Sequence, residues 1–337
     1  MSVRAAIYGC AGPAITEGER HFFRETKPWG FILFARNISN PGQVQRLIGE
    51  LREAAGHEAE VLIDQEGGRV QRLTPPNWRG FPPGRRYGEV YEADAEQGLH
   101  AARLGAQLIA AELRHLGITV DCLPVLDVPF PGAHDVIGDR AYADTPGPIA
   151  ALGLAAAEGL LAGGVLPVIK HIPGHGRAGV DSHKSLPVVD TSADELARID
   201  FAPFHALRHM PLAMTAHVVY TALDADRPAT TSASVIAKVI RGQIGFDGVL
   251  MSDDLSMEAL KGTLGERARQ SLEAGCDLVL HCNGKMGEME KVAVEVPILS
   301  GKALQRSQAA ISRRLSTIAS LDMDSAWRQF SGLIAAS

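Results

Sequence analysis

Eight short apolar segments, each followed by a longer segment of helical periodicity, recur along the 337 residues of this chain. Apolar or β-branched runs between turn signals are typical of buried strands, and apolar residues at helical spacing indicate amphipathic helices. We expect the strands at residues 5–8, 31–34, 61–63, 118–120 with 123–126, 165–169, 212–216, 248–251 and 277–280. Eight alternating units predict an α/β fold, a single (β/α)8 barrel of the TIM type formed by residues 1–337 as one catalytic domain.

Helices are expected between these strands, but their pattern does not show whether the sheet closes. A doubly wound open sheet is therefore the alternative fold. We expect the helices near 15–24, from 41 onward, and at 93–116, 147–163, 192–209, 233–244, 256–274 and 302–318. Barrel enzymes carry their chemistry at the C-terminal ends of the strands. Polar residues follow the expected strands at Asp64, Arg140, Lys170, His171, His217 and Asp253.

Composition excludes several classes of protein. The net charge is −6, and Lys and Arg are scattered, so no basic field favours nucleic acid. The cysteines Cys10, Cys122, Cys276 and Cys282 lack metal-site or redox spacing, which predicts free thiols in a reducing compartment. We interpret residues 5–12 as the first strand rather than as a signal segment, and therefore expect a cytoplasmic protein without a membrane span.

The densest group of titratable side chains lies at residues 170–183, after the fifth expected strand. The segment reads Lys-His-Ile-Pro-Gly-His-Gly-Arg-Ala-Gly-Val-Asp-Ser-His and has no helical periodicity. We expect a loop, and loops of this length in compact domains are usually lids or binding loops.

Three other interpretations of this loop were weighed. Residues 174–179 match the Gly-x-Gly-x-x-Gly pattern, but no helix is expected after them, as a dinucleotide site would require. A metal could bind His171, His175 and His183 with Asp181, although Pro and Gly at 173 and 174 prevent a helical ligand pair. A surface loop whose histidines satisfy backbone groups is the third possibility.

Two carboxylates end the seventh expected strand at Asp253 and Asp254. Neighbouring side chains on a strand point in opposite directions, so the two are not expected to act as an acid–base pair on one substrate atom. Asp253 is expected to rise into the barrel mouth. One of the two is a candidate nucleophile or base, and the other is expected to cap the following helix.

The loop supplies a second titratable pair, Asp181 and His183. Their i, i+2 spacing places both side chains on one side of an extended segment, where the carboxylate orients the imidazole and raises its pKa. That pair suits a general acid near neutral pH. A strand-end carboxylate opposite such a histidine fits double displacement at an acetal carbon.

These segments resemble the signatures of family 3 glycoside hydrolases, in particular the single-domain bacterial β-N-acetylhexosaminidases of cell-wall recycling. The resemblance extends from about residue 30 to 283 and keeps the order of the motifs. It rests on residues 64–72, 170–176, 181–187, 216–220, 252–257 and 274–277. Ile172 and the Ala141-Tyr142 pair depart from the usual residues, and this leaves the fine shape of the subsite open.

The resemblance implies a role for each matching residue. It makes Asp253 the nucleophile, His183 the general acid/base and Asp181 the partner that orients His183. It also implies that Asp64, Arg72, Arg140, Lys170 and His171 bind the terminal N-acetylglucosamine.

The implied reaction is retaining hydrolysis without cofactor or metal. The implied substrate carries a non-reducing β-linked N-acetylglucosamine, on 1,6-anhydro-N-acetylmuramic acid with or without its peptide. We expect a monomer that acts on this small muropeptide and not on a membrane or nucleic acid. Rival hypotheses are a phosphorylase on the same scaffold, a metal-dependent barrel hydrolase or aldolase, and a non-catalytic sugar-binding barrel.

Overall fold

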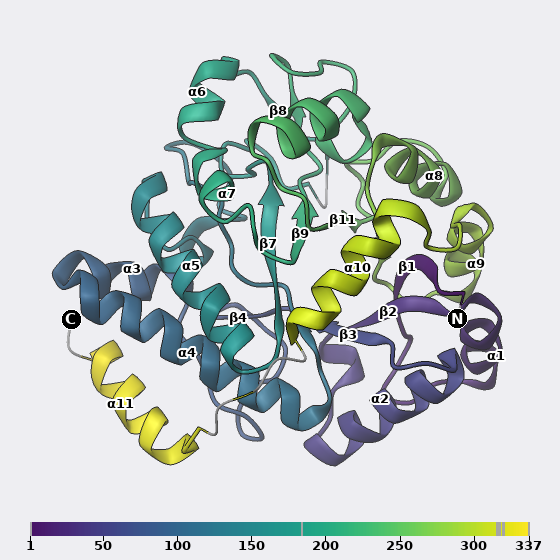
Figure 1. Ribbon diagram of the computed structural model, residues 1–337, viewed down its shortest axis with the longest axis horizontal. Helices are drawn as coiled ribbons and strands as arrows, with labels where there is room; N and C mark the ends of the chain where they lie inside the picture. Colours follow the sequence, from purple (N-terminus) through teal and green to yellow (C-terminus); the bar gives the residue numbers. More distant parts are fainter. Residues whose placement is uncertain (1, 183–184, 315–317, 319–320, 336–337) are drawn as a thin grey trace.

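The computed structural model describes residues 2–182, 185–314, 318 and 321–335, and eight parallel strands among them close into a barrel (Figure 1). In order around the barrel, the strands are β1 Arg4–Gly9, β2 Pro28–Leu33, β3 Glu60–Ile63, β6 Val120–Asp121, β7 Leu166–Ile172, β9 Leu212–Thr215, β11 Val249–Asp254 and β12 Leu278–His281. The ring closes where Ala6 of β1 pairs with Val279 of β12 and Tyr8 pairs with His281. The predicted barrel is confirmed, and the open-sheet alternative is wrong.

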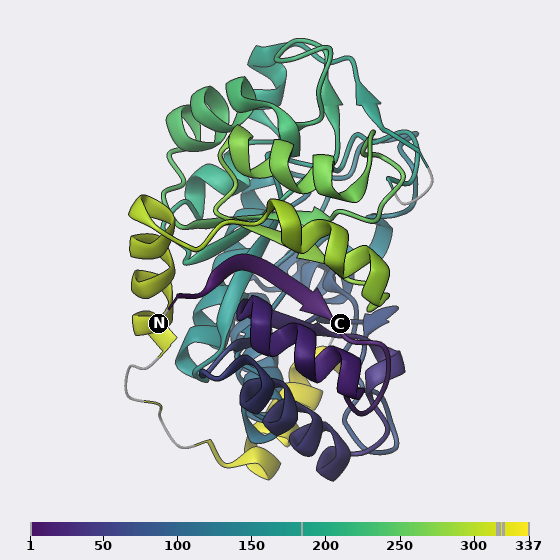
Figure 2. The same ribbon diagram turned by 90° about the vertical axis from the view of Figure 1, so that its right-hand side faces the viewer.

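Helices cover the outside of the barrel (Figures 1 and 2). In the described residues they are α1 Glu17–Thr26, α2 Pro41–Ala55, α3 Gly84–Ala93, α4 Ala95–Leu116, α5 Pro146–Ala162, α6 Ala193–Arg198, α7 Ala202–Ala206, the π-helix η4 Val235–Gln243, α8 Leu264–Ala274, α9 Met286–Glu295, α10 Gly301–Arg314 and α11 Met323–Ala335. Local sequence explains their ends. In α2, the Asn40 side chain accepts a hydrogen bond from the Gln43 N–H, Pro41 occupies the first turn, and Gly56 ends the helix at φ 73°.

Two of the expected helices differ from the structure. The helix expected at 192–209 is divided into α6 and α7, because Pro203 in the first turn of α7 has no N–H and cannot continue a helix from before it. The helix expected at 256–274 begins only at Leu264, where Thr263 and Glu266 form a capping box. The prediction that one of the two strand-end aspartates caps this helix is therefore wrong.

Several short elements were not expected from periodicity. They are α3, α9, α11, the antiparallel pair β4 Gln65–Gly67 and β5 Val70–Gln71, and the parallel pair β8 Val188–Val189 and β10 Val219–Tyr220. Helix α11 packs against α3 and α4. Trp327 and Phe330 of α11 contact the ring of Phe81, which lies in the segment before α3.

Two barrel strands are longer at their C-terminal ends than the apolar runs suggested. Strand β7 continues through Lys170 and His171, which were expected in the loop, and β11 continues through Asp253 and Asp254. Apolar periodicity ends where the polar side chains begin, but the backbone pairing continues. These functional candidates therefore stand on the barrel itself.

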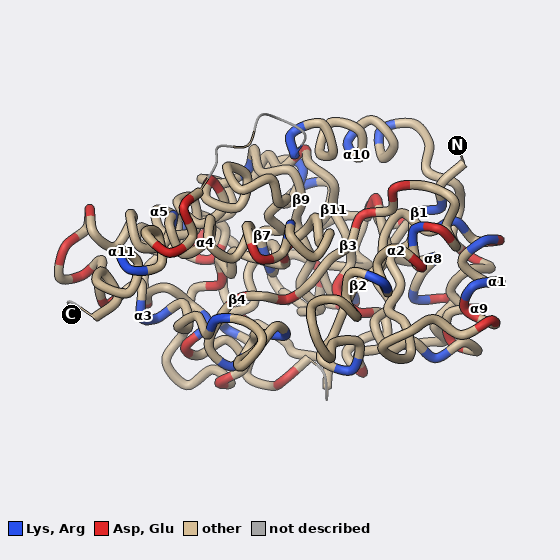
Figure 3. Tube along the Cα trace, turned by 90° about the horizontal axis from the view of Figure 1, so that it is seen from below, with Lys and Arg blue, Asp and Glu red and all other residues tan. Residues whose placement is uncertain are grey.

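The other end of the barrel is crossed by α10, and acidic and basic residues are mixed along the Cα trace (Figure 3). Of the helices in the described residues, none is both long and apolar enough to cross a bilayer. All four cysteines are free thiols, as predicted.

Candidate active site

A cavity of about 320 Å³ lies at the C-terminal ends of the barrel strands. Its walls come from the ends of β2, β7, β9, β11 and β12 and from the segments that follow β2, β3, β6, β7 and β12. The predicted site residues that line it are Asp64, Arg72, Arg140, Lys170, His171, Asp181 and Asp253. The fold therefore brings together residues separated by up to 189 positions, from Asp64 to Asp253, at the edge where TIM barrels place their chemistry.

Asp64 is held between two cations. Its Oδ1 lies 3.0 Å from Lys170 Nζ and its Oδ2 lies 3.0 Å from a guanidinium nitrogen of Arg72. Burial favours protonation of the Asp64 carboxyl, but the Lys170 and Arg72 charges outweigh burial and hold its pKa below the usual range. Asp64 is thus an ionised acceptor with a fixed orientation.

Glu66 is a further carboxylate in this network. Arg140 donates from Nε and Nη2 to the two Glu66 oxygens, each at 2.8 Å, and Lys170 Nζ lies 2.6 Å from Oε1. Burial raises the pKa of Glu66, but Arg140 and Lys170 lower it to about 2. Such a two-point pair fixes the plane of the guanidinium, so Glu66 orients the Arg140 side chain in the cavity wall.

Asp127 orients His171 and the start of the following loop. Its Oδ1 accepts from the backbone N–H groups of His171 and His175, and its Oδ2 lies 2.7 Å from His171 Nδ1. Burial raises the pKa of Asp127, but the two histidines lower it to about 2. Because an ionised carboxylate only accepts, His171 Nδ1 carries the hydrogen, and its other ring nitrogen remains for the cavity.

Asp253 and Asp254 have different surroundings at the end of β11. The pairing of β11 with β12 shifts between Met251 and Asp254, and both aspartates contribute to the cavity wall. The Asp254 carboxylate accepts from the N–H and hydroxyl of Ser256 and from the Cys282 N–H. The Asp254 oxygens therefore brace the backbone, whereas Asp253 Oδ1 accepts from the Asp254 N–H at 2.8 Å.

The loop after β7 brings Asp181 to the same cavity as Asp253. The neighbouring Ser182 is buried, its hydroxyl lies 3.1 Å from His175 Nε2, and its carbonyl accepts from the Ala259 N–H. His183, the predicted acid/base, lies outside the described residues. The structure thus places Asp181, the residue predicted to orient His183, in the cavity wall.

The glycines of this loop have a packing role. A Cβ on Gly176 would lie 1.8 Å from the Val128 carbonyl oxygen, and one on Gly174 would lie 3.1 Å from Asp200 Cβ. Residues 171–176 are all buried. The close backbone approach at Gly176 is sufficient reason for a residue without a side chain.

The metal and dinucleotide interpretations of the loop have no counterpart in the described structure. No group of three or more His, Cys, Asp or Glu among the described residues is arranged to hold a metal ion. Of the proposed ligands, His171 faces Asp127 and His175 faces Ser182. Between residues 177 and 187, the positions that the structure describes contain no helix to receive a pyrophosphate.

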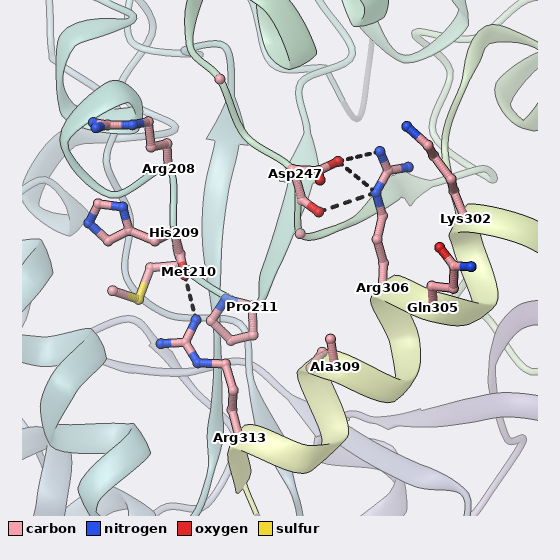
Figure 4. A pocket seen from close by; sticks show the side chains of 13 residues that line it. Arg208, His209, Met210, Pro211, Asp247, Lys302, Gln305, Arg306, Ala309 and Arg313 are labelled. Atoms are coloured by element: carbon pink, nitrogen blue, oxygen red, sulfur yellow. Dashed lines mark hydrogen bonds and ion pairs between the residues drawn. The ribbon is translucent and has the colours of Figure 1, made fainter.

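A larger cavity of about 550 Å³ lies at the opposite end of the barrel, between α10 and the segments that precede β9 and β11 (Figure 4). Arg306 in its wall donates to Asp247 and Asp277, and Arg313 donates to the His209 carbonyl. These guanidinium groups brace neighbouring segments. Because this end of a TIM barrel serves stability, we assign the chemistry to the smaller cavity.

Sequence reasoning missed two charged groups of the site, Glu66 and Asp127. Glu66 lies within the 64–72 motif, and Asp127 directly follows the apolar run 123–126. A polar residue after an apolar run, the signal that identified the other strand-end candidates, was therefore present at Asp127 as well. Ile172, Ala141 and Tyr142, the departures that left the fine shape of the subsite open, are buried, and none of them lies in the described cavity wall.

Comparisons with known proteins identify the family of this chain. Residues 13–321 match the glycosyl hydrolase family 3 N-terminal domain. A beta-hexosaminidase of Bordetella avium is 38% identical over 277 residues, which are 81% of this chain and 79% of the relative. A beta-hexosaminidase of Aromatoleum aromaticum is 37% identical over 90% of this chain and 86% of the relative.

Solved structures give the same result. NagZ from Neisseria gonorrhoeae, in complex with N-trifluoroacetyl-D-glucosamine, superposes with a TM-score of 0.88 at 33% identity over 99% of both chains. A family 3 beta-N-acetylglucosaminidase from Paenibacillus sp. superposes with a TM-score of 0.86 at 32% identity, over 98% of this chain and 66% of the other. The resemblance inferred from the motifs is confirmed: the chain belongs to glycosyl hydrolase family 3 and is a glycoside hydrolase.

Proposed function

We propose that this enzyme is a retaining exo-β-N-acetylglucosaminidase that removes a non-reducing terminal N-acetylglucosamine from muropeptides. The observation that carries the proposal is the single cavity shared by Asp181, Asp253 and the Asp64–Lys170–Arg72 network. A cavity of about 320 Å³ suits one monosaccharide unit. The names of the relatives and the glucosamine derivative bound by one of them support the same sugar.

The binding part of the mechanism follows from the charges. The ionised Asp64 accepts hydrogen bonds from sugar hydroxyls, while Lys170, Arg72 and Arg140 donate to hydroxyl and carbonyl oxygens. His171, oriented by Asp127, presents its other ring nitrogen to the sugar. These groups hold the ring so that its anomeric carbon lies over Asp253.

The covalent part is double displacement. Asp253 attacks the anomeric carbon and forms a glycosyl ester, while His183, oriented by Asp181, gives its proton to the departing oxygen. His183 then takes a proton from water, the water oxygen attacks the same carbon, and the Asp253 carboxylate is released. The two inversions return the β configuration.

The leaving group that we propose is 1,6-anhydro-N-acetylmuramic acid, with or without its peptide. We further propose a cytoplasmic monomer, folded as one catalytic domain over residues 1–337, that works without cofactor or metal in peptidoglycan recycling. Product analysis in phosphate buffer distinguishes hydrolysis from phosphorolysis: free N-acetylglucosamine supports the proposal, and its 1-phosphate supports the phosphorylase.

A slow 5-fluoro glycosyl donor with a chromogenic leaving group tests the nucleophile. The donor is incubated with the enzyme, which is then digested, and the labelled peptide is found by mass spectrometry. We expect the label on Asp253; a label on another residue, or none, would contradict the assignment. His183→Ala is expected to slow poor leaving groups more than good ones, because only poor ones need the proton. Equal losses for both would argue against the acid role.

A further inference from the structure

The peptide group between Asp254 and Leu255 is held from both neighbouring strands. Its carbonyl oxygen lies 3.1 Å from Nε2 of His217, two residues after the end of β9, and its N–H donates to the Leu280 carbonyl of β12 at 2.9 Å. The Asp254 side chain adds a bond from the Cys282 N–H at 3.1 Å. This peptide therefore has little freedom to rotate.

His217 belongs to a buried network of hydrogen bonds. A carbonyl oxygen only accepts, so His217 Nε2 carries a hydrogen and donates it to Asp254. Burial lowers the pKa of His217, which favours the neutral ring. Its Nδ1 then accepts from the Thr230 hydroxyl at 2.7 Å, a hydrogen that the Ala216 carbonyl, 3.2 Å from the same oxygen, shares. The Thr215 hydroxyl lies 2.8 Å from the Thr230 oxygen. His217, Thr230 and Thr215 are all fully buried.

Asp254, whose backbone is restrained in this way, forms a hydrogen bond with the proposed nucleophile, Asp253. The Asp254 N–H donates to Asp253 Oδ1 at 2.8 Å. This bond stabilises the ionised carboxylate and fixes the position of its Oδ1 oxygen. The geometry of the hydrogen bond between Asp254 and Asp253 depends on the orientation of the Asp254 backbone. His217 restrains that backbone through the Asp254 carbonyl group.

We infer that His217 is a positioning residue that holds the Asp253 carboxylate in its attacking orientation through the backbone of Asp254. The inference rests on the proposed role of Asp253. His217 is absent from the described cavity wall, so it acts without touching the sugar. By the same reasoning, the hydroxyl groups of Thr230 and Thr215 orient the His217 imidazole.

Three variants separate this role from general stability. His217→Leu removes the donor to Asp254, His217→Gln keeps an N–H at the position of Nε2, and Thr230→Val removes the hydroxyl that orients the ring. The matched control is His57→Leu. His57 Nε2 also lies 2.9 Å from a backbone carbonyl, that of Pro28, but at the N-terminal end of the barrel.

The measurements are the rate of labelling by the 5-fluoro donor, kcat and KM for a chromogenic N-acetyl-β-glucosaminide, and the pH dependence of kcat/KM. For His217→Leu we expect labelling and kcat to fall by about tenfold or more with KM nearly unchanged, because misalignment affects the attack and not sugar binding. The acid limb of kcat/KM is expected to move to higher pH, since a misaligned Asp254 N–H stabilises the Asp253 anion less. The charged groups facing His217 are Asp253 and Asp254, with His171 nearby.

His217→Gln is expected to recover most of the lost rate, and Thr230→Val to give a smaller loss in the same direction. The control His57→Leu is expected to keep the rate and the acid limb of the unmodified enzyme. Folded His217→Leu or Thr230→Val protein with unchanged labelling rate and acid limb would overturn the inference. If the unmodified enzyme is not labelled on Asp253, the proposed function fails instead.

Discussion

Lys170 Nζ lies 3.0 Å from Asp64 Oδ1, and the Lys170 side chain is only 2% exposed. The same nitrogen lies 2.6 Å from Glu66 Oε1, so one buried ammonium serves two carboxylates. The Asp64 and Glu66 charges raise the pKa of Lys170 against the effect of burial, and the group stays charged. This relationship explains how a barrel mouth can hold several ionised groups in the absence of sugar.

Replacing Lys170 by Met is expected to destabilise the fold and the site together. Removing one partner of a buried ion network leaves uncompensated charge, which costs about 3–5 kcal/mol. The midpoint of urea unfolding should fall accordingly, and kcat/KM should drop by about a hundredfold as the sugar-binding geometry is lost. Lys285→Met is the control, because Lys285 forms an exposed pair with Glu288 at 3.2 Å. Its cost should stay below about 1 kcal/mol. Equal midpoints for the two variants would contradict the prediction.

Replacing Arg140 by Lys tests the two-point pair with Glu66. A lysine keeps the charge but cannot donate to both oxygens in one plane, so KM should rise by about tenfold or more while the fold persists. Arg85→Lys is matched to it, since Arg85 also donates to both oxygens of a carboxylate, Asp144, at an exposed position. We expect steady-state kinetics of Arg85→Lys to equal those of the unmodified enzyme. An unchanged KM in Arg140→Lys would remove Arg140 from the sugar-binding set.

His175 is expected to make the fold sensitive to acid. Burial lowers its pKa to about 4, and the neighbouring His171 acts in the same direction. The unfolded chain binds this proton near pH 6.5, so the stability associated with neutral His175 is present above about 6.5 and is lost as pH falls toward 4. The loss is on the order of 3 kcal/mol for a shift of about 2.5 pH units.

The measurement for His175 is urea unfolding at several pH values between 7.5 and 4.5. His175→Gln cannot titrate but can still reach the Ser182 hydroxyl. The free energy of unfolding of this variant, relative to that of the unmodified protein, should therefore rise as the pH falls. If the free energies of unfolding of the two proteins change with pH in parallel, protonation of His175 is not coupled to unfolding.

Gly176 and Gly179 lie in the same loop, but we expect an added side chain to destabilise the fold only at Gly176. A Cβ on Gly176 would meet the Val128 carbonyl at 1.8 Å, whereas one on Gly179 would have no atom within 4 Å. Gly176→Ala should lower the free energy of unfolding by about 1–3 kcal/mol or more, because backbone must move. Gly179→Ala should change it by less than about 1 kcal/mol. Thermal unfolding of both variants measures these changes. Equal decreases in the free energy of unfolding would indicate that the backbone at Val128 moves at little cost.

Local sequence predicted most of the elements and part of the site. All eight strands overlap the apolar runs that indicated them, although the fourth, expected at 118–120 with 123–126, is only Val120–Asp121. Of the residues expected at the C-terminal strand ends, all except His217 line one cavity. The errors lie where tertiary contacts overrule periodicity. Residues 256–262 were expected to be helical, yet the Asp254 carboxylate binds Ser256 and the helix begins only after Thr263.

The sequence by itself determined the alternation of strands and helices, the strand-end position of Lys170, His171 and Asp253, and the ordered motifs of the family. These depend on residue types at short spacing, which an amino-acid sequence displays directly. Tertiary structure alone decided that β1 pairs with β12, that Glu66 faces Arg140, and that Asp127 orients His171. Each of these contacts joins groups that are distant in the chain. The energy of such a contact depends on how close and how buried the two groups are, and both are set only when the barrel closes.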